Sequence, residues 1–457
     1  MGKLNKNRVK RIPLLLLIIS IMFIAEAITF THISSAEEAK KPLALGFGEN
    51  ERFTLYSNGE VHRLLSQNQT LPLSKIQLAG EVNGATIIDF EVYGQNLYLY
   101  IYTSLNSSWG RTTIAVYDLV SEEKTFTKTY EFAITQENQT QKVMGNMVLA
   151  ASACPHAFAV ITANTTHALI EVYKEKHGGF EKTATYSGRM AMSIYRYNET
   201  LIAATFKAEM KDSMPWITPQ ITDIVENKTL FSLPALIPVA ALAYPFIQPF
   251  NYNNTWECHV TVYNQRMNRM EYYIVYPEKQ GLIDSNATTV SPYMEYLIID
   301  QKKGSKIIFN NGEAITVAQK LSIIPQGAYM PLDPKNGVLD ANPANKSILV
   351  KVVEGDKAKI LYLTQKSTIE LYTLNASSTS KTEGFYAALV QNTVYIINPE
   401  NHDLVAISLK NIEEQKGNWG LTVAITLAGT TIILVVTLLL IMHHKSKMMK
   451  MRRSIKT

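Results

Sequence analysis

The sequence has few of the residues and motifs that would reveal a chemistry. Only two of its 457 residues are cysteines, which excludes a disulfide-rich scaffold. It has no Gly-x-Ser-x-Gly elbow, no phosphate-binding loop, no His-Glu-x-x-His pair and no EF-hand loop. We therefore predict no catalytic residue, no cofactor and no metal site, and a non-enzymatic function is favoured although an enzyme is not excluded.

Basic residues gather at the N-terminus, where the first eleven residues carry five Lys and Arg. An apolar run from Ile12 to Ala25 follows, and as a helix it would span only about 21 Å of a hydrocarbon core of about 30 Å. This length predicts a signal peptide over residues 1–36, with cleavage after Ala27 or after Ala36. An uncleaved anchor is the alternative.

The C-terminal end predicts a membrane anchor. Residues 420–442 carry no charge, Trp419 precedes them, and six Lys and Arg without an acidic residue follow. A run of this length spans a bilayer, and the positive-inside rule places the basic end in the cytoplasm. We expect a stalk over 410–418, a transmembrane helix over 419–442 and a cytoplasmic tail over 443–457. The protein would then be a single-pass protein of the cell membrane with its N-terminal part outside.

Ten Asn-x-Ser/Thr sequons occur between the two ends and none occurs in the tail. Sequons accept N-linked glycans in extracellular proteins, so these positions also predict exposed turns or outward strand faces. Residues 37–418 carry an excess of five acidic residues, which gives no reason to expect nucleic-acid binding. The predicted glycosylation sites are Asn68, Asn106, Asn138, Asn164, Asn198, Asn227, Asn253, Asn286, Asn345 and Asn375.

Cys154 and Cys258 are the only cysteines. In an oxidising compartment a single disulfide between them is the simplest expectation. Since His156 and His259 lie close to them in sequence, a tetrahedral metal site is a less favoured alternative.

Short β-branched and aromatic runs dominate residues 37–409. Asn96–Tyr102, Thr112–Tyr117 and Thr393–Ile397 are clear examples, and the Asn58-Gly59 pair predicts a hairpin turn. The spacing predicts an all-β extracellular domain over residues 37–409 without an internal linker.

Two strand pairs are built alike. Residues 94–100 lead through a loop to 114–119, and residues 391–397 lead similarly to 403–409. These pairs resemble the middle strands of β-propeller blades, although no blade fingerprint of a specific family is present. The resemblance implies a propeller of seven or eight blades, and tandem β-sandwiches are the alternative.

One segment departs from the strand pattern. Residues 230–250 carry no charge and include four prolines, which would disrupt a membrane helix. We expect a proline-rich loop, either buried on a sheet or exposed to a protein partner or lipid. The predicted contact residues are Leu236, Ile237, Phe246 and Ile247.

Scattered acidic residues are the only trace of a catalytic site. Asp284, Asp300, Asp333 and Asp340 could include a glycosidase pair. His402 and Asp403 could form a base with its orienting carboxylate, but a solvated hairpin is the simpler interpretation.

Together these features predict a cell-surface glycoprotein whose propeller-like domain binds a protein partner as an envelope scaffold or adhesion component. One alternative is an extracellular propeller enzyme, such as a glycoside hydrolase or a quinoprotein-like oxidoreductase. Another is a membrane-proximal protein that binds a sugar or another solute.

Overall fold

The structure is a computed structural model that describes most of the chain between residues 41 and 410. The described ranges are 31–32, 41–48, 51–66, 68–78, 85–106, 108–137, 140–164, 168–188, 194–197, 199–211, 213–232, 237–238, 243–252, 255–264, 269–275, 280–284, 289–293, 296–301, 304–309, 313–317, 336–342, 344–365, 367–375, 387–398 and 401–410. The predicted transmembrane helix, the tail and nearly all of the predicted leader lie outside them. Within these ranges no helix combines the length and the apolar character that a bilayer span requires.

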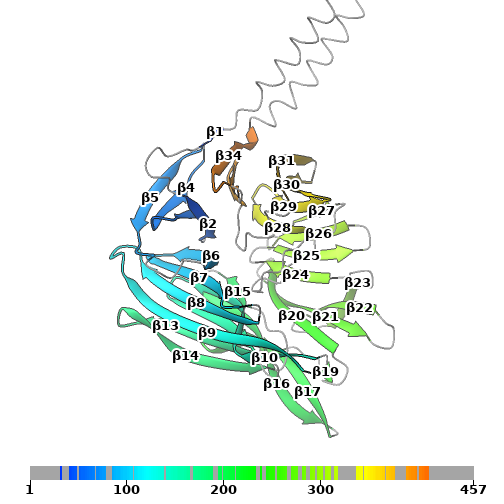
Figure 1. Cartoon of the computed structure of the whole chain (residues 1–457). Coiled ribbons are helices and arrows are strands. Elements are labelled where there is room, and N and C mark those ends of the chain that lie inside the picture. Colours follow the sequence, from blue (N-terminus) through cyan, green and yellow to red (C-terminus); the bar gives the residue numbers. More distant parts are fainter. Residues whose placement is uncertain are drawn as a thin grey trace, which may run out of the picture. The chain divides into compact units, whose positions relative to one another are not determined.

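The described part of the chain is all-β, as predicted, and its strands follow one another in antiparallel four-stranded units (Figure 1). The first unit comprises β2 (Pro42–Phe47), β3 (Arg52–Tyr56), β4 (Glu60–Leu64) and β5 (Thr70–Lys75). The second comprises β6 (Thr86–Tyr93), β7 (Asn96–Ser104), β8 (Trp109–Asp118) and β9 (Lys124–Glu137), extended by β10 (Thr140–Gly145), and the third comprises β11 (Met147–Cys154), β12 (Ala157–Ala163), β13 (Ala168–Lys176) and β14 (Gly179–Gly188). The fourth comprises β15 (Ile194–Tyr197), β16 (Thr200–Lys211), β17 (Met214–Asp223) and β18 (Lys228–Ser232), with β19 (Ile237–Pro238) added on β17.

The remaining units have the same order. The fifth comprises β20 (Ala243–Tyr252), β21 (Thr255–Asn264), β22 (Arg269–Val275) and β23 (Gln280–Asp284), and the sixth comprises β24 (Thr289–Tyr293), β25 (Tyr296–Gln301), β26 (Gly304–Phe309) and β27 (Ala314–Val317). The seventh comprises β28 (Asn336–Asn342), β29 (Ser347–Glu354), β30 (Lys357–Thr364) and β31 (Thr368–Asn375). The last comprises β32 (Ala387–Val390), β33 (Thr393–Ile397) and β34 (Leu404–Ser408), completed by β1 (Thr31–His32). Repeated four-stranded meanders resemble the blades of β-propellers and differ from the Greek-key order of β-sandwiches.

The last unit takes its fourth strand from the N-terminal part of the chain. β1 pairs antiparallel with β34, with Thr31 opposite Ala406 and His32 opposite Val405. The first two units are also joined, because β2 and β6 pair in parallel at Phe47 and Glu91. Contacts between residues far apart in sequence therefore link the beginning and the end of the sheet array.

The predicted hairpin at Asn58 and Gly59 is confirmed, although its loop between β3 and β4 has three residues. Gly59 adopts a φ of +84°, and its carbonyl accepts a hydrogen bond of 3.0 Å from the Ile76 backbone nitrogen. A Cβ at this position would lie only 1.9 Å from the Ile76 carbonyl oxygen. Glycine is therefore required both by the backbone conformation and by the close approach of residue 76.

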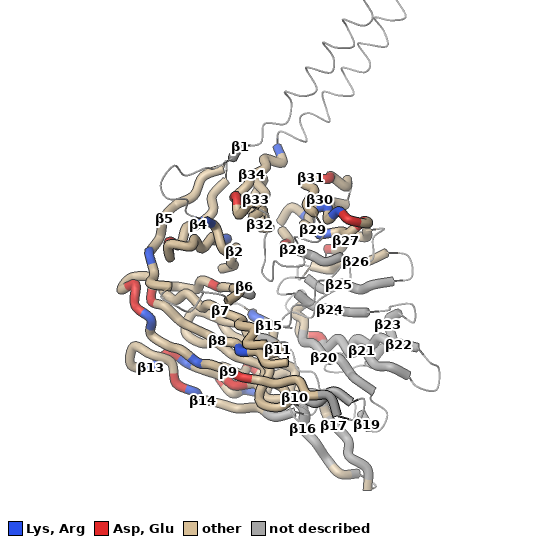
Figure 2. The backbone as a smooth tube through the Cα atoms, viewed as in Figure 1, with Lys and Arg blue, Asp and Glu red and all other residues tan. Residues whose placement is uncertain are grey.

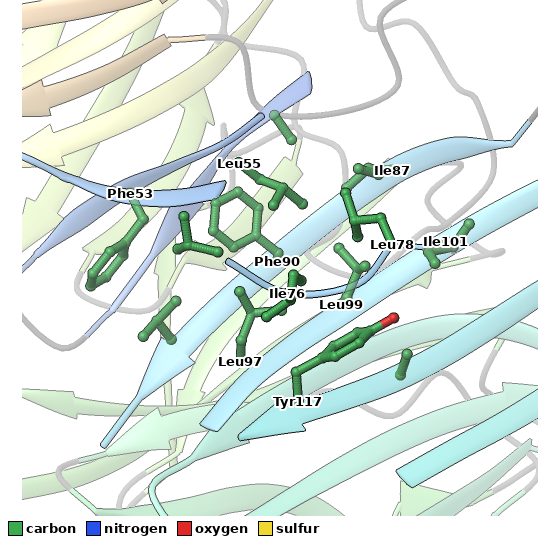
Figure 3. Packing of buried hydrophobic residues seen from close by; sticks show 14 residues of the cluster. Phe53, Leu55, Ile76, Leu78, Ile87, Phe90, Leu97, Leu99, Ile101 and Tyr117 are labelled. Atoms are coloured by element: carbon green, nitrogen blue, oxygen red, sulfur yellow. The ribbon is translucent and has the colours of Figure 1, made fainter. Parts of the chain in front are cut away.

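The apolar core lies between consecutive units rather than inside any one of them. One cluster joins β2, β3 and β4 to β6, β7 and β8 and contains Phe53, Leu55, Phe90 and Leu99 (Figure 3). Similar clusters join the units of β6 and β11, of β11 and β15, and of β24 and β28. Each unit thus buries its apolar side chains by packing against the next unit in the chain.

Aromatic rings fill the junction between β7–β9 and β12–β14. The rings of Phe158 and Tyr173 stack in parallel with their centroids 4.7 Å apart. Phe126 and Phe180 lie against the same Phe158 ring at 5.4 and 5.5 Å. Such ring pairs add to the free energy gained by burial, so this junction is one of the strongest in the described chain.

The proline-rich segment 230–250 is not a single loop, which corrects the prediction made from its composition. β19 lies within it, and its last part belongs to β20, which pairs with β21 along Phe246–Tyr252. The prolines of β20 are compatible with a strand because β20 is the edge strand of its sheet order, with β21 as its one paired neighbour there.

Candidate functional site

A buried carboxylate lies where three consecutive units meet. Glu91 of β6 is only 1% exposed, and its Oε2 accepts a hydrogen bond of 2.8 Å from the backbone nitrogen of Ala153 in β11. Arg196 of β15 supplies a nearby positive charge, and its guanidinium lies 4.6 Å from the centre of the Tyr93 ring. The side chains therefore connect β6, β11 and β15.

Burial raises the pKa of Glu91 to about 7, because a charged carboxylate loses its hydration there. The Ala153 N–H and the positive charge of Arg196 stabilise the carboxylate and oppose this rise. Burial likewise raises the pKa of the neighbouring Cys154 thiol to about 11, so this thiol is a poor nucleophile at neutral pH.

A second carboxylate makes the same type of connection elsewhere in the array. Asp340 of β28 accepts a 2.7 Å hydrogen bond from the backbone nitrogen of Leu389 in β32. It also binds Arg52 of β3 through two hydrogen bonds of 2.9 Å. The guanidinium of Arg52 lies 4.9 Å from the centre of the Phe47 ring, as that of Arg196 does near Tyr93.

The two connections occupy matching positions. Glu91 and Asp340 each lie two residues before the end of the first strand of their unit. The N–H groups that they bind, those of Ala153 and Leu389, each belong to the residue before the end of the next unit's first strand. The arginine comes from a third unit in each case. Arg196 belongs to the unit of β15, which follows that of β11, and Arg52 belongs to the first unit of the array. We refer to these two sets as the carboxylate bridges.

The burial of both carboxylates determines what the bridges can do. Glu91 and Asp340 are 1% and 3% exposed, so a solute cannot reach them without opening the units. Their hydrogen bonds satisfy backbone N–H groups and hold neighbouring first strands at fixed separation. We therefore assign them a structural role. Sequence reasoning named Asp340 only as a scattered carboxylate and did not identify Glu91, although an acidic residue inside the apolar run Phe90–Val92 is a usable signal.

Of the other predicted acidic and histidine candidates, the structure describes His402 and Asp403. The side chains of Asp284 and Asp300, and all of Asp333, lie outside the described part of the structure. His402 lies in the β33–β34 turn with a φ of +59°, and its backbone nitrogen donates to the Asn398 carbonyl. The Asp403 carboxylate accepts a 2.6 Å hydrogen bond from the side chain of Asn401. This geometry is that of a hairpin turn.

Six of the ten predicted glycosylation sites lie in the described ranges. Asn106, Asn227, Asn345 and Asn375 are exposed, whereas Asn68 and Asn164 are half-buried. Each of the six lies in a turn or at a strand end. Asn138, Asn198, Asn253 and Asn286 lie outside the described ranges.

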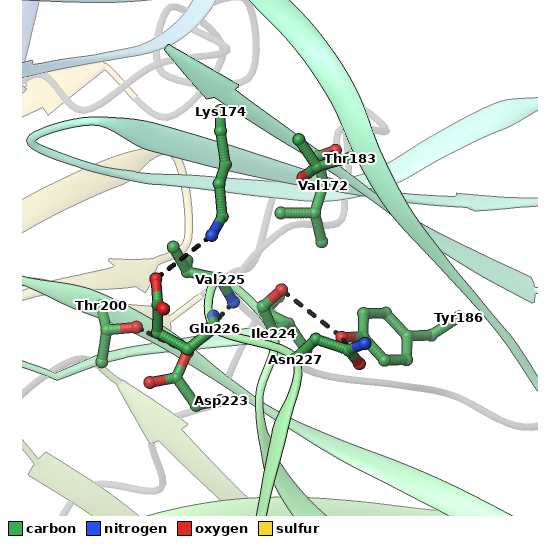
Figure 4. A network of polar contacts seen from close by, with 10 residues as sticks. All are labelled: Val172, Lys174, Thr183, Tyr186, Thr200, Asp223, Ile224, Val225, Glu226 and Asn227. Atoms are coloured by element: carbon green, nitrogen blue, oxygen red, sulfur yellow. Dashed lines mark hydrogen bonds and ion pairs between the residues drawn. The ribbon is translucent and has the colours of Figure 1, made fainter. Parts of the chain in front are cut away.

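Asn227 belongs to a turn that is held from the neighbouring unit (Figure 4). Its Oδ1 accepts a 2.8 Å hydrogen bond from the hydroxyl of Tyr186 in β14, and Glu226 forms an ion pair of 3.1 Å with Lys174 in β13. Within the turn, Asp223 Oδ1 accepts hydrogen bonds from the backbone nitrogens of Val225 and Glu226. The position of this sequon is therefore fixed by two units.

The disulfide between Cys154 and Cys258 stays a prediction, because the side chain of Cys258 lies outside the described part. The thiol of Cys154 is buried. The two residues belong to different sheets, in β11 and β21. His156 follows β11, and its Nδ1 lies 3.0 Å from Oε2 of Glu175. Among the described residues, no three His, Cys, Asp or Glu side chains gather as a metal site.

The predicted contact residues of the apolar segment fall on two strands. Ile237 lies in β19, directly opposite Ile217 of β17, and Phe246 and Ile247 lie in β20. Their side chains, like the whole of Leu236, lie outside what the structure describes. Close to β19, on the β16–β17 hairpin, Met210 is 72% exposed.

Charged residues of both signs are interspersed over the described surface. Figure 2 shows them side by side along β9, β13 and β14. Some form ion pairs between neighbouring strands, such as Lys182 with Glu171 at 3.2 Å and Lys176 with Glu181 at 2.9 Å. Exposed pairs of this kind add little stability.

Comparison with known proteins relates the chain to others at the level of fold alone. No family model and no curated protein matches the sequence. The structural neighbours include a β-propeller. The Dos1 propeller is 8% identical with a TM-score of 0.41, covering 83% of this chain and 94% of its own. A eukaryotic initiation factor is 9% identical with a TM-score of 0.42, covering 84% and 89%. Hsv2 of Kluyveromyces lactis is 8% identical with a TM-score of 0.37, covering 74% and 100%.

Proposed function

We propose that this protein is a single-pass cell-surface glycoprotein whose extracellular domain, an eight-bladed β-propeller, binds a protein partner as a scaffold or adhesion component. The observation that carries the proposal is the tip of the β16–β17 hairpin. There β19, which belongs to the uncharged proline-rich segment, pairs with the outer part of the hairpin, and the same part carries the exposed Met210.

The hairpin is much longer than the strands beside it. β16 and β17 have twelve and ten residues, whereas β15 and β18 have four and five. β15 pairs only with residues 200–203, and β18 only with residues 220–223. In the described ranges, β19 is the strand that pairs with the outer part, at Trp216 and Ile217. A hairpin that extends past its own sheet is a typical place for binding residues.

The side chain at this tip suits protein binding. Met210 is 72% exposed, although its long apolar side chain gains free energy only when it is covered. Exposed apolar side chains that act as anchors in binding sites become buried in the partner's surface. We name this end of the hairpin, which carries Met210, the hairpin tip.

The connectivity of the last sheet agrees with a membrane anchor. The first residue of β1 and the last residue of β34 lie at the same end of these two strands, since the strands pair antiparallel. The predicted stalk of nine residues reaches at most about 30 Å. A predicted anchor after it would therefore begin within about 30 Å of chain from the last strand.

The first test is to isolate the full chain from its native membrane in mild detergent, cross-link it and identify stoichiometric companions by mass spectrometry. Replacing Met210 by Asp should weaken binding of the identified partner by at least about tenfold. Val120→Asp is the matched control, because Val120 is also 72% exposed but lies in the β8–β9 turn. A chain without a stoichiometric companion, or equal binding by both variants, would refute the proposal.

A further inference from the structure

The β7–β10 region exposes a second apolar surface, distinct from the hairpin tip. Trp109 of β8 and Met144 of β10 both lie opposite Ala133 of β9, so the two side chains share one face of the sheet. They are 49% and 61% exposed, while Ala133 between them is 3% exposed. Leu105, in the turn before β8, is 46% exposed. We call Leu105, Trp109 and Met144 the apolar row.

The residue that begins a sequon lies inside this row. Asn106 follows Leu105 and precedes Trp109 by three positions, and its sequon is completed by Ser108. Its Oδ1 accepts hydrogen bonds from the backbone nitrogens of Ser108 at 2.8 Å and Trp109 at 2.9 Å. The Nδ2 atom, which would carry a glycan, takes part in neither bond. The turn thus fixes the side chain with its oxygen directed inward and its nitrogen available.

The strand alternation separates the indole of Trp109 from an aromatic cluster on the other face of β8. Gly110 points to the opposite face, where an added Cβ would lie 2.7 Å from the Phe132 ring and 2.9 Å from the Tyr102 ring. These two rings stack on that face with centroids 6.5 Å apart. The face of Trp109 carries the buried Ala115 and Tyr117 further along β8, but Trp109 is the first residue of the strand, and its indole remains 49% exposed.

We infer that the apolar row is the surface on which the N-linked oligosaccharide of Asn106 lies, with its first sugar ring stacked on the indole of Trp109. This inference rests on the extracellular location in the proposed function. One face of a pyranose ring carries mainly C–H groups, and it loses contact with water when it covers an aromatic ring.

The surroundings of the row match the rest of such a sugar. Two residues along the same face, Arg111 of β8 pairs with Glu131 of β9, with 4.0 Å between Nη1 and Oε1. Both side chains are exposed, at 40% and 55%. Sugar hydroxyl groups at the rim of the stacked ring can therefore hydrogen-bond to a guanidinium and a carboxylate.

The sequence repeats the spacing at another sequon. Asn253-Asn-Thr-Trp256 has the same pattern as Asn106-Ser-Ser-Trp109, although the chain contains only four tryptophans. At the second place the Trp256 ring contacts the Tyr197 ring at 4.8 Å, so it already packs against the protein. Leu71, another large exposed apolar residue, also follows a sequon, that of Asn68, by three positions. Of these two apolar residues that follow a sequon by three positions, Leu71 is exposed, as Trp109 is.

The test uses the full-length protein made in a glycosylating eukaryotic cell line and purified in detergent. Ser108→Ala removes the sequon but keeps Asn106 and both backbone donors to its Oδ1. Ser107→Ala is the matched control, because it leaves the sequon intact. Glycopeptide mass spectrometry measures occupancy at every sequon, and hydroxyl-radical footprinting measures the oxidation rate of each Trp and Met.

We expect Asn106 to be glycosylated in the wild type and in Ser107→Ala. In Ser108→Ala the oxidation of Trp109 and Met144 should become at least about threefold faster, because the covering sugar is gone. Met210, which is exposed but remote in sequence from any sequon, should be oxidised equally in all three proteins. In Trp109→Ala, an endoglycosidase should release the Asn106 glycan faster than from the wild type.

The possible failures are distinguishable. An empty Asn106 with glycans at other sequons, or unchanged oxidation rates of Trp109 and Met144 in Ser108→Ala, would overturn this inference alone. If no sequon carried a glycan, the extracellular location in the proposed function would fail together with the inference. Loss of partner binding in Met210→Asp would bear on the proposed function and not on the apolar row.

Discussion

The guanidinium of Arg52 donates two hydrogen bonds of 2.9 Å to the carboxylate of Asp340, although the two residues are 288 positions apart in the sequence. Asp340 is 3% exposed and also accepts the N–H of Leu389. One side chain therefore joins the second-to-last unit, that of β28, to the last unit and to the first. Together with the β1–β34 pairing, it ties the two ends of the array.

We expect Arg52→Met to lower the free energy of unfolding by about 3–5 kcal/mol, because it leaves the buried Asp340 charge without its partner. Arg63→Ala is the control, since the Arg63–Glu51 pair is exposed by 35% and 45%. Its loss should cost about 0–1 kcal/mol. Urea unfolding of both variants measures the difference, and equal losses would show that the bridge contributes no more than a surface pair.

Glu91 should make the stability depend on pH. Its folded pKa of about 7 lies above the ordinary value of 4.5, so the folded state holds its proton more tightly than the unfolded chain. The stabilisation is complete below pH 4.5 and is lost as the pH rises toward 7, amounting to about 3 kcal/mol. Unfolding in urea at several pH values should reveal this slope, and Glu91→Gln should flatten it. A variant that keeps the wild-type slope would assign the dependence to other groups.

Phe158→Ala should be among the most destabilising single substitutions in the described core. The Phe158 ring is 0% exposed and contacts the rings of Tyr173, Phe126 and Phe180 across two units. Removing a buried phenyl ring of this kind costs about 3–5 kcal/mol. Val120→Ala, at a side chain that is 72% exposed, should change stability by less than about 0.5 kcal/mol. The comparison is made by thermal and urea unfolding, and similar effects of the two substitutions would contradict the packing.

If the predicted leader is cleaved, β1 indicates which of the two expected sites is used. Cleavage after Ala36 would remove Thr31 and His32 and leave β34 without its outer neighbour, whereas cleavage after Ala27 would keep them. An unpaired edge strand exposes backbone groups and favours aggregation. We therefore expect the mature chain to begin at Ile28. N-terminal mass spectrometry of the purified protein decides this, and a mature chain beginning at Glu37 would show that β1 is dispensable.

Much of the local structure could be predicted from local pattern. The runs Asn96–Tyr102, Thr112–Tyr117 and Thr393–Ile397 lie within β7, β8 and β33, because β-branched and aromatic residues favour strands wherever they occur. The pair Asn58-Gly59 marked a turn for a similarly local reason, since the conformation of Gly59 is one that other residues avoid. The prediction of a loop for the proline-rich segment was wrong, because prolines in an edge strand do not prevent strand pairing.

The sequence by itself determined the all-β class, the positions of many strands and turns, and the ten candidate glycan sites, because each depends on residues that are neighbours in the chain. Only the tertiary structure decided that Arg52 meets Asp340, that Glu91 meets Ala153 and that Trp109 and Met144 flank Ala133. These partners lie between 11 and 288 residues apart, and strand register and packing between units bring them together. No local preference encodes such a contact, since it appears only when many weak interactions order the whole array at once.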